Sequence, residues 1–267
     1  HSYHIESLSI TLDDFDNDQL VKEFLEHHTE SLKKLKLLFA NESAKFAVNK
    51  MKLEELTCGQ VAFGSQSIKL RPNNSIKKLA IYAEAEDNND VVASYHSILT
   101  ACKGVERLTI YDDGHVGGSA MKIISNSMRN LKYLSIPRYT SLQTINPMAC
   151  LETLKVKDVE TKDEHRAWIK LAMSCPNLSR IKIIQRPRIT DRSFSIPSKS
   201  LKKLLKSCGK LRELCIGPHL ELTDDFKDTI LSYENANKLL LLIESLNYNE
   251  DVEKVKEFDN SSVRCEV

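Results

Sequence analysis

The chain has 267 residues, of which 41% are hydrophobic and 28% are charged. This composition is typical of a globular protein with a large core, and no apolar run approaches the roughly 18–20 residues that a membrane helix needs. Lys and Arg number 38 against 37 Asp and Glu, so the overall charge gives no reason to expect a nucleic acid or an acidic membrane as partner.

An apolar residue recurs at positions i, i+3 and i+5 along the whole chain. The units start at Ile5, Leu32, Leu53, Ile76, Val105, Leu131, Leu151, Leu178 and Leu211, with a degenerate tenth, Ala236/Leu239/Leu241. The last two apolar residues of each unit would point to one side of a short strand, because side chains alternate along a strand. Most spacings between starts fall in the range of about 20–29 residues that is typical of leucine-rich repeats.

Five segments between these strands carry apolar residues at the helical period, namely residues 17–28, 90–103, 117–129, 162–175 and 199–208. The units that start at Leu53 and Leu131 have Pro- and Gly-containing connections instead, so we expect them to be irregular. The pattern predicts an α/β leucine-rich-repeat solenoid, a horseshoe with a concave parallel sheet and convex helices. We expect a single domain over residues 1–267, with an irregular C-terminal cap from about residue 236.

Seven cysteines are thinly spread over the chain and form no C-x-x-C pair, which disfavours both a disulfide framework and a zinc site. Three of them stand three residues before the first apolar position of a unit, a place that methionine takes in two other units. The cysteines are Cys102, Cys175 and Cys208, and the methionines are Met128 and Met148. Since methionine cannot form a bridge or act as a nucleophile, we expect these thiols to be buried, reduced and far apart. Cys265 is the one that we expect to react, and Cys150 has no assigned role.

The stretches "LSRIKIIQRPRITDRSF" and "LRELCIGPHLELTDDF" resemble the cysteine-containing class of leucine-rich repeat. In that class the strand leads to a loop cysteine and then to an "ITD"-type helix start. Residues 189–191 and 222–224 match the helix start, whereas Arg186 and His219 stand where the family has its cysteine. The resemblance implies the substrate-binding half of F-box proteins, which are receptors of cullin-type ubiquitin ligases, in the cytoplasm or nucleus.

A different class of function is also open, namely a secreted or host-delivered effector or interaction protein on the same scaffold. The chain begins at His1, and an F-box or a signal peptide, whichever precedes it, is absent from the sequence. Four sequons, at Asn41, Asn73, Asn177 and Asn260, would suit secretion. The upstream segment would therefore distinguish the two classes.

Three motifs with possible chemistry have simpler structural explanations. The Gly-rich residues 111–122 lack the Gly-Lys-Ser/Thr of a P-loop. Residues 163–165, Asp-Glu-His, stand at a predicted helix start, where acidic residues complement the helix dipole, and we expect a solvated face there. His27 and His28 are adjacent and diverge around a helix. We therefore predict a protein that is not an enzyme and has no cofactor or metal.

Positions i+2, i+4 and i+6 of each unit would face the concave surface. Read over ten units, they contain two acidic residues, Glu55 and Glu213, against nine basic ones. The basic residues are Lys34, Lys36, Lys78, Arg107, Lys155, Lys157, Arg180, Lys182 and Lys238. The sequence thus predicts a positively charged face on a nearly neutral chain.

Three tyrosines, Tyr82, Tyr111 and Tyr133, fall on the same face in successive units. Tyr and Arg often anchor protein interfaces. We predict that a protein or peptide of acidic character binds across this face, and a nucleic acid is a weaker alternative. The predicted site comprises Tyr82, Arg107, Tyr111, Tyr133, Lys155, Lys157, Arg180 and Lys182.

Overall fold

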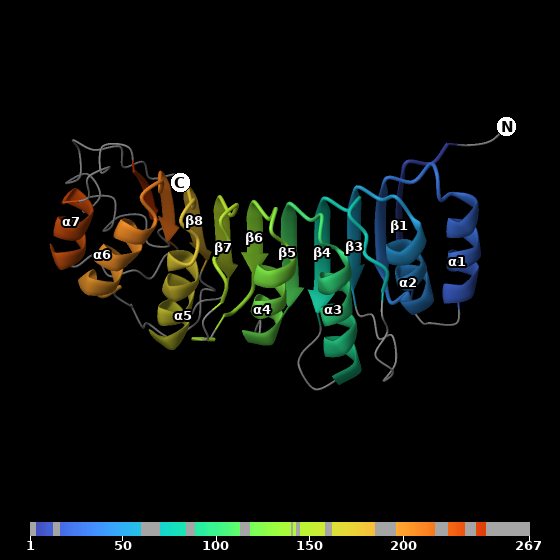
Figure 1. Cartoon of the computed structure of the whole chain (residues 1–267), viewed down its shortest axis with the longest axis horizontal. Helices are drawn as coiled ribbons and strands as arrows, with labels where there is room; N and C mark the ends of the chain where they lie inside the picture. Colours follow the sequence, from blue (N-terminus) through green and yellow to red (C-terminus); the bar gives the residue numbers. More distant parts are fainter. Residues whose placement is uncertain are drawn as a thin grey trace, which may run out of the picture. The chain divides into compact units, whose positions relative to one another are not determined.

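A computed structural model of the chain describes residues 4–12, 17–59, 70–83, 89–112, 118–139, 141–142, 145–157, 162–184, 196–216, 224–232 and 239–243. The chain divides into two compact units, His1–Lys132 and Tyr133–Val267. Both are α/β units in which short strands pair in parallel in chain order (Figure 1).

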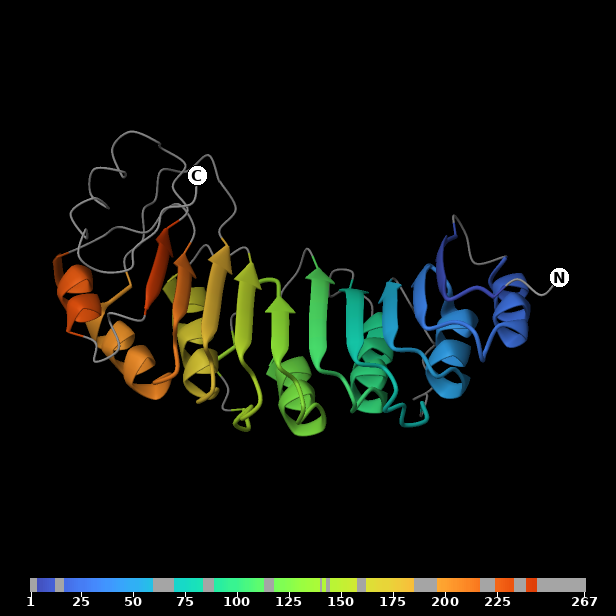
Figure 2. The same ribbon diagram turned by 90° about the horizontal axis from the view of Figure 1, so that it is seen from above.

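The first unit has five strands: β1 (Ser7–Thr11), β2 (Lys34–Leu38), β3 (Glu55–Gly59), β4 (Lys78–Ala83) and β5 (Arg107–Asp112). Its helices are α1 (Asp18–His27), α2 (Asn41–Lys50), α3 (Asn89–Ala101) and α4 (Gly118–Ser127). Figure 2 shows the helices on one side of these strands, so that the sheet has one helix-covered face.

The second unit has the strands β6 (Tyr133–Ile136), β7 (Thr153–Lys157), β8 (Arg180–Ile184), β9 (Glu213–Ile216) and β10 (Leu240–Ile243). Its helices are α5 (Lys162–Met173), α6 (Ser198–Ser207) and α7 (Asp224–Leu231). They too lie on one side of their strands (Figure 2). Among the described residues, no helix stands between β6 and β7, as expected for the unit that starts at Leu131, whereas residues 60–69 of the connection between β3 and β4 lie outside the described residues.

In both units, the helix-covered face of the strands carries the predicted apolar pattern. In β2, Leu35 and Leu37 are buried, whereas Lys34 and Lys36 point to the other face. Positions i, i+3 and i+5 are buried in every unit that starts between Leu32 and Leu211. Burying one such side chain is worth about 1.5–3 kcal/mol, so this repeated triplet supplies much of the core.

The tenth unit differs from the sequence prediction by two residues. Leu240 pairs with Glu213, and Ile243 pairs with Ile216. In register, Leu241 and Ile243 therefore take the places that the sequence prediction gave to Leu239 and Leu241, while Leu239 is itself buried. Leu240 therefore takes the register position that the prediction gave to Lys238, and Lys238 itself lies outside the described residues, as does most of the predicted cap.

The five predicted helices are confirmed, α2 is an addition, and α7 begins at Asp224, the last residue of the helix start that the resemblance gave at 222–224. Helix α2 was missed because its buried side is made of small residues, such as Ala44 and Ala47, rather than of leucines. Its first turn is held from α1 by the Asp18 carboxylate, which accepts hydrogen bonds from the backbone N–H groups of Glu42 (2.6 Å) and Ser43 (3.0 Å). A carboxylate in this place satisfies N–H groups that a helix leaves without partners.

The cysteines of the helix ends are buried, as predicted. Cys102, Cys175 and Cys208 have no exposed surface and are free thiols. Burial raises the pKa of Cys208 to about 12. The expectation that all three lie far apart is wrong for two of them, because Cys208 Sγ lies 4.0 Å from the carbonyl oxygen of Cys175. Their positions are equivalent in neighbouring repeats, and stacking brings equivalent positions together.

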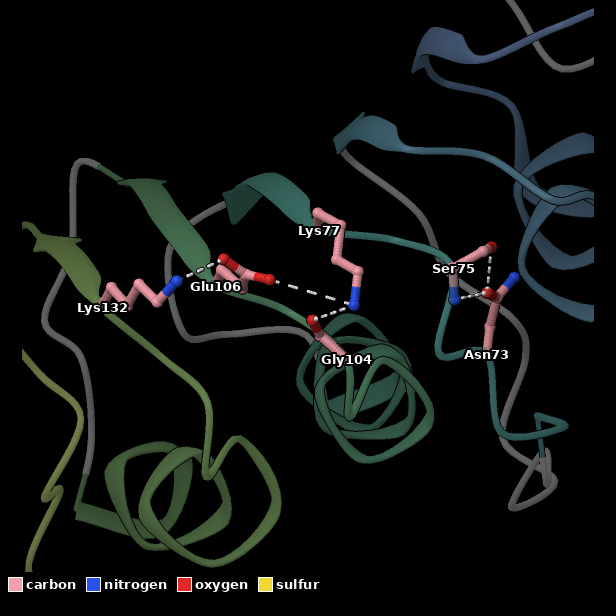
Figure 3. A network of polar contacts seen from close by, with 6 residues as sticks. All are labelled: Asn73, Ser75, Lys77, Gly104, Glu106 and Lys132. Atoms are coloured by element: carbon pink, nitrogen blue, oxygen red, sulfur yellow. Dashed lines mark hydrogen bonds and ion pairs between the residues drawn. The ribbon is translucent and has the colours of Figure 1, made fainter.

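A row of alternating charges runs along the edge where the strands of the first unit begin; we call it the charge row. It consists of the i+1 residues Glu6, Lys33, Glu54, Lys77, Glu106 and Lys132. Each backbone N–H after the first donates to the carbonyl of the preceding member, at 2.8–2.9 Å. Lys132 Nζ lies 2.9 Å from a Glu106 carboxylate oxygen, and Lys77 Nζ lies 4.0 Å from the other (Figure 3).

The side chain of Asn73 links two repeats of the first unit through hydrogen bonds made by both its amide nitrogen and its amide oxygen. Its amide nitrogen donates to the carbonyls of Val48 (2.9 Å) and Met51 (3.0 Å), and its Oδ1 accepts from the backbone N–H of Ser75 (Figure 3). A glycan at this sequon would have to break these buried bonds. The side chain of Asn177 is used in a similar way, because it donates to the carbonyl of Ala149. These two sequons therefore have a structural explanation.

Candidate functional site

The candidate site lies on the open face, which we define in each unit as the sheet face opposite the helices. Strand pairing aligns its side chains in rows across the strands. In the first unit the entry row is Ser7, Lys34, Glu55, Lys78 and Arg107; the middle row is Ser9, Lys36, Thr57, Ala80 and Thr109; the exit row is Thr11, Leu38, Gly59, Tyr82 and Tyr111. All the predicted positions of this unit thus share one face.

Tyr82 and Tyr111 form a stacked pair in the exit row, which we call the tyrosine pair. Their ring centroids are 4.5 Å apart and their planes differ by 19°. The two residues are 36% and 38% exposed, which makes them two of the few exposed large apolar residues among those described. Stacked rings hold each other in place, so the pair presents a fixed aromatic surface to solvent.

Gly59 positions the tyrosine pair from the neighbouring strand. It is in register with Tyr82 on one side and with Leu38 on the other. A Cβ atom at Gly59 would lie 2.6 Å from Tyr82 Cβ and 2.9 Å from Leu38 Cδ2, which is closer than real Cβ contacts. The missing side chain therefore leaves room for both Leu38 and Tyr82 beside this strand, and the exit row is apolar from Leu38 to Tyr111.

The entry row of the first unit contains a carboxylate between two ammonium groups. Glu55 Oε1 lies 2.8 Å from Lys78 Nζ and 3.2 Å from Lys34 Nζ. The hydrogen bond from Lys78, together with that from Lys34, holds the pKa of Glu55 below its ordinary value although partial burial opposes this. With Arg107 next in the row, the row keeps an excess of positive charge.

The predicted basic residues of the second unit are arranged in a different way. Arg180 Nε lies 2.5 Å from a Glu213 carboxylate oxygen across β8 and β9, so this arginine is ion-paired within the face. Lys155 and Lys182 are in register on β7 and β8, and Lys157 lies beside Ile184. Two basic side chains therefore lie directly across from each other on this face.

Tyr133 occupies a different row of the open face from the tyrosine pair. It begins β6, where it is half-buried and in register with Thr153, so it belongs to an entry row and not to an exit row. The sequence prediction assigned Tyr133 to the correct face but did not distinguish between the rows of that face. Two positions at i+4 in the second unit, Ser135 and Cys215, are buried.

The prediction of a solvated face at residues 163–165 is wrong for His165. This residue is only 4% exposed, and Trp168 donates its indole N–H to His165 Nδ1 at 3.0 Å. Burial lowers the pKa of His165 to about 4, so the ring is neutral at pH 7. The i, i+3 spacing with the only tryptophan was the signal in the sequence, since such residues share one side of a helix.

Comparisons with known proteins do not assign the chain. No model of a protein family matches it, and no curated protein is similar to it at a significant level. No group of three or more His, Cys, Asp or Glu side chains is arranged to hold a metal ion in the part of the chain that the structure describes. None of the helices in the same part is long and apolar enough to cross a membrane.

Proposed function

We propose that this chain is a leucine-rich-repeat module, a solenoid over residues 1–267, that binds a protein or peptide of acidic character on its open sheet face and catalyses no reaction. The tyrosine pair is the observation that carries the proposal. Two stacked aromatic rings stay partly exposed, and Gly59 positions them from the neighbouring strand. A rigid, exposed aromatic anchor loses little entropy when a partner covers it, which is why such residues dominate binding energy.

The charges of the same face support an acidic partner. The entry row of the first unit has three basic residues and one carboxylate, and the second unit sets Lys155 beside Lys182. Exposed lysines are expected to raise the association rate and its sensitivity to salt, while the desolvated tyrosines contribute most of the affinity.

The more specific role that we propose is a substrate receptor of a cullin-type ubiquitin ligase. The support is the resemblance of residues 178–194 and 211–226 to cysteine-containing leucine-rich repeats. Asp224, the last residue of the second matching helix start, is the first residue of α7. Finding the partner ubiquitinated in a manner that depends on this protein would support this role, and a partner that is bound but never modified would contradict it.

The binding proposal is tested by selecting a displayed peptide library against the purified protein and measuring Kd for the selected peptides. Replacing both Tyr82 and Tyr111 by Ala should weaken binding by at least about 2 kcal/mol, or about 30-fold, which is the usual range for a hot spot. The melting temperature should change little, because both residues are more than a third exposed.

Phe24→Ala is the matched control. Phe24 lies on helix α1 and is 38% exposed, as Tyr111 is, but it does not belong to the open face. The proposal predicts that this change leaves Kd unaltered. It is wrong if no peptide is selected, or if the selected peptides ignore the tyrosine changes and lose affinity with Phe24→Ala.

A further inference from the structure

We infer that the open face of β4 and β5 recognises an extended peptide segment at two points. A large apolar side chain of the peptide packs against the tyrosine pair, and a carboxylate four residues away binds the basic residues of the entry row. In the free protein, Glu55 occupies the place of this ligand carboxylate. This inference rests on the proposed function and names its ligand. It adds a spacing, and it assigns Glu55 as an internal competitor.

The spacing follows from the geometry of two adjacent strands. Tyr82 and Tyr111 occupy position i+6 of their units, and Lys78 and Arg107 occupy position i+2. Four residues of strand span about 13 Å, so the aromatic and basic ends of the face are separated by this distance. An extended peptide rises by the same amount per residue, and its side chains at i and i+4 point the same way.

The middle row leaves room for such a segment. Between the tyrosines and the basic residues lie Ala80 and Thr109, which are in register with each other. Both side chains are short, and Ala80 is only partly buried. A peptide that follows the strand direction can therefore lie over these two residues and reach both ends at once.

Glu55 shows what the basic end binds. Its Oε1 takes a hydrogen bond of 2.8 Å from Lys78 and lies 3.2 Å from Lys34, which is the arrangement that a ligand carboxylate would adopt. The contact is solvent-accessible, since both lysine side chains are 54% exposed and that of Glu55 is 32% exposed. Exposed ion pairs of this kind contribute little stability, so an incoming carboxylate can compete with Glu55.

The experiment uses the whole 267-residue protein and a synthetic peptide, Ser-Trp-Ser-Thr-Ser-Glu-Ser, in which Trp and Glu are four residues apart. Its Kd is measured by NMR titration at low salt, together with the reversed sequence, so that both chain directions are tested. Glu55→Gln should strengthen binding by up to about fivefold, because it releases two lysines from an exposed pair. Lys78→Gln should weaken binding several-fold and should keep the protein folded, since this side chain is exposed.

Glu106→Gln is the matched control for charge. Glu106 also lies between two lysines, Lys77 and Lys132, but it belongs to the charge row and not to the open face (Figure 3). The change adds the same charge to the protein and should leave Kd unaltered. A second peptide with Trp and Glu three residues apart directs the two side chains to opposite faces and should bind more weakly than the first.

The inference is overturned if Glu55→Gln leaves the affinity unchanged, if Glu106→Gln raises it equally, or if both peptide spacings bind equally well. Its failure is distinguishable from failure of the proposed function. Library peptides that need the tyrosine pair but do not respond to Glu55→Gln would leave the proposed function standing and reject the two-point ligand. Library peptides that do not need the tyrosine pair would reject both.

Discussion

Gly59 offers a direct test of how the tyrosine pair is positioned, through the substitution Gly59→Ala. The new Cβ atom would lie 2.6 Å from Tyr82 Cβ and 2.9 Å from Leu38 Cδ2. The leucine methyl group can rotate away, but Tyr82 Cβ is fixed to the backbone of β4 and can move only with the strand. Overpacking of this kind costs about 1–3 kcal/mol. We expect a loss of that size in the free energy of unfolding, and weaker peptide binding because the tyrosine pair is displaced.

The assay is urea unfolding followed by circular dichroism, with Gly209→Ala as control. A Cβ atom at Gly209 would meet nothing within 4 Å, so this change should be neutral or slightly stabilising. Gly104→Ala should cost the most of the three, because its Cβ atom would lie 2.3 Å from the backbone oxygen of Asn74. From the most to the least stable variant, the order should thus be Gly209→Ala, Gly59→Ala and Gly104→Ala.

A double-mutant cycle refines this prediction. The close contact is with Tyr82 Cβ, which Tyr82→Ala keeps and Tyr82→Gly removes. The destabilisation caused by Gly59→Ala should therefore be nearly as large in the Tyr82→Ala background, and smaller in the Tyr82→Gly background. Equal coupling in the two cycles would refute the reasoning, as would a Gly59→Ala protein that is as stable as the parent.

Three further predictions concern buried groups. Because burial lowers the pKa of His165 from an ordinary 6.5 to about 4, the unfolded state binds a proton first as the pH drops. The free energy of unfolding should therefore be unaffected by this group above pH 6.5 and should decrease by about 3 kcal/mol down to pH 4. Urea unfolding of His165→Gln should lack this decrease. Asp18→Ala should cost about 1–2 kcal/mol in the same assay, because buried N–H groups of α2 lose their acceptor, and an unchanged stability would show that this cap is unimportant. In the native protein a thiol reagent should label the exposed Cys150 quickly and Cys102 only after unfolding, and equal labelling rates would contradict the burial.

The repeated strand could be predicted from the sequence because its evidence is redundant. Each unit supplies the same three buried positions, so an error in one unit is corrected by its neighbours. The end of the repeat has no such support. The run Leu239–Ile243 fits the pattern at two alignments, and only the pairing of Leu240 with Glu213 decides between them.

The candidate site was predicted in its face but not in its rows. Tyr82 and Tyr111 could be assigned to one face from the period of two, and the structure brings them together. Gly59 was missed because a residue without a side chain gives no pattern to count, although its whole effect comes from that absence. His165 was misjudged since its acidic neighbours in sequence indicated solvent, whereas its contact with Trp168 depends on the side of the helix.

The charge row makes the repeats of the first unit non-interchangeable. Signs alternate from Glu6 through Lys33, Glu54 and Lys77 to Glu106, and neighbours in the row are joined by backbone hydrogen bonds. Deleting one internal repeat would set Lys33 beside Lys77, or Glu54 beside Glu106, and like charges would face each other at the junction. Deleting two adjacent repeats would preserve the alternation. This unit should therefore tolerate the loss of repeats in adjacent pairs better than the loss of one. Duplication should likewise be tolerated better when two adjacent repeats are added together.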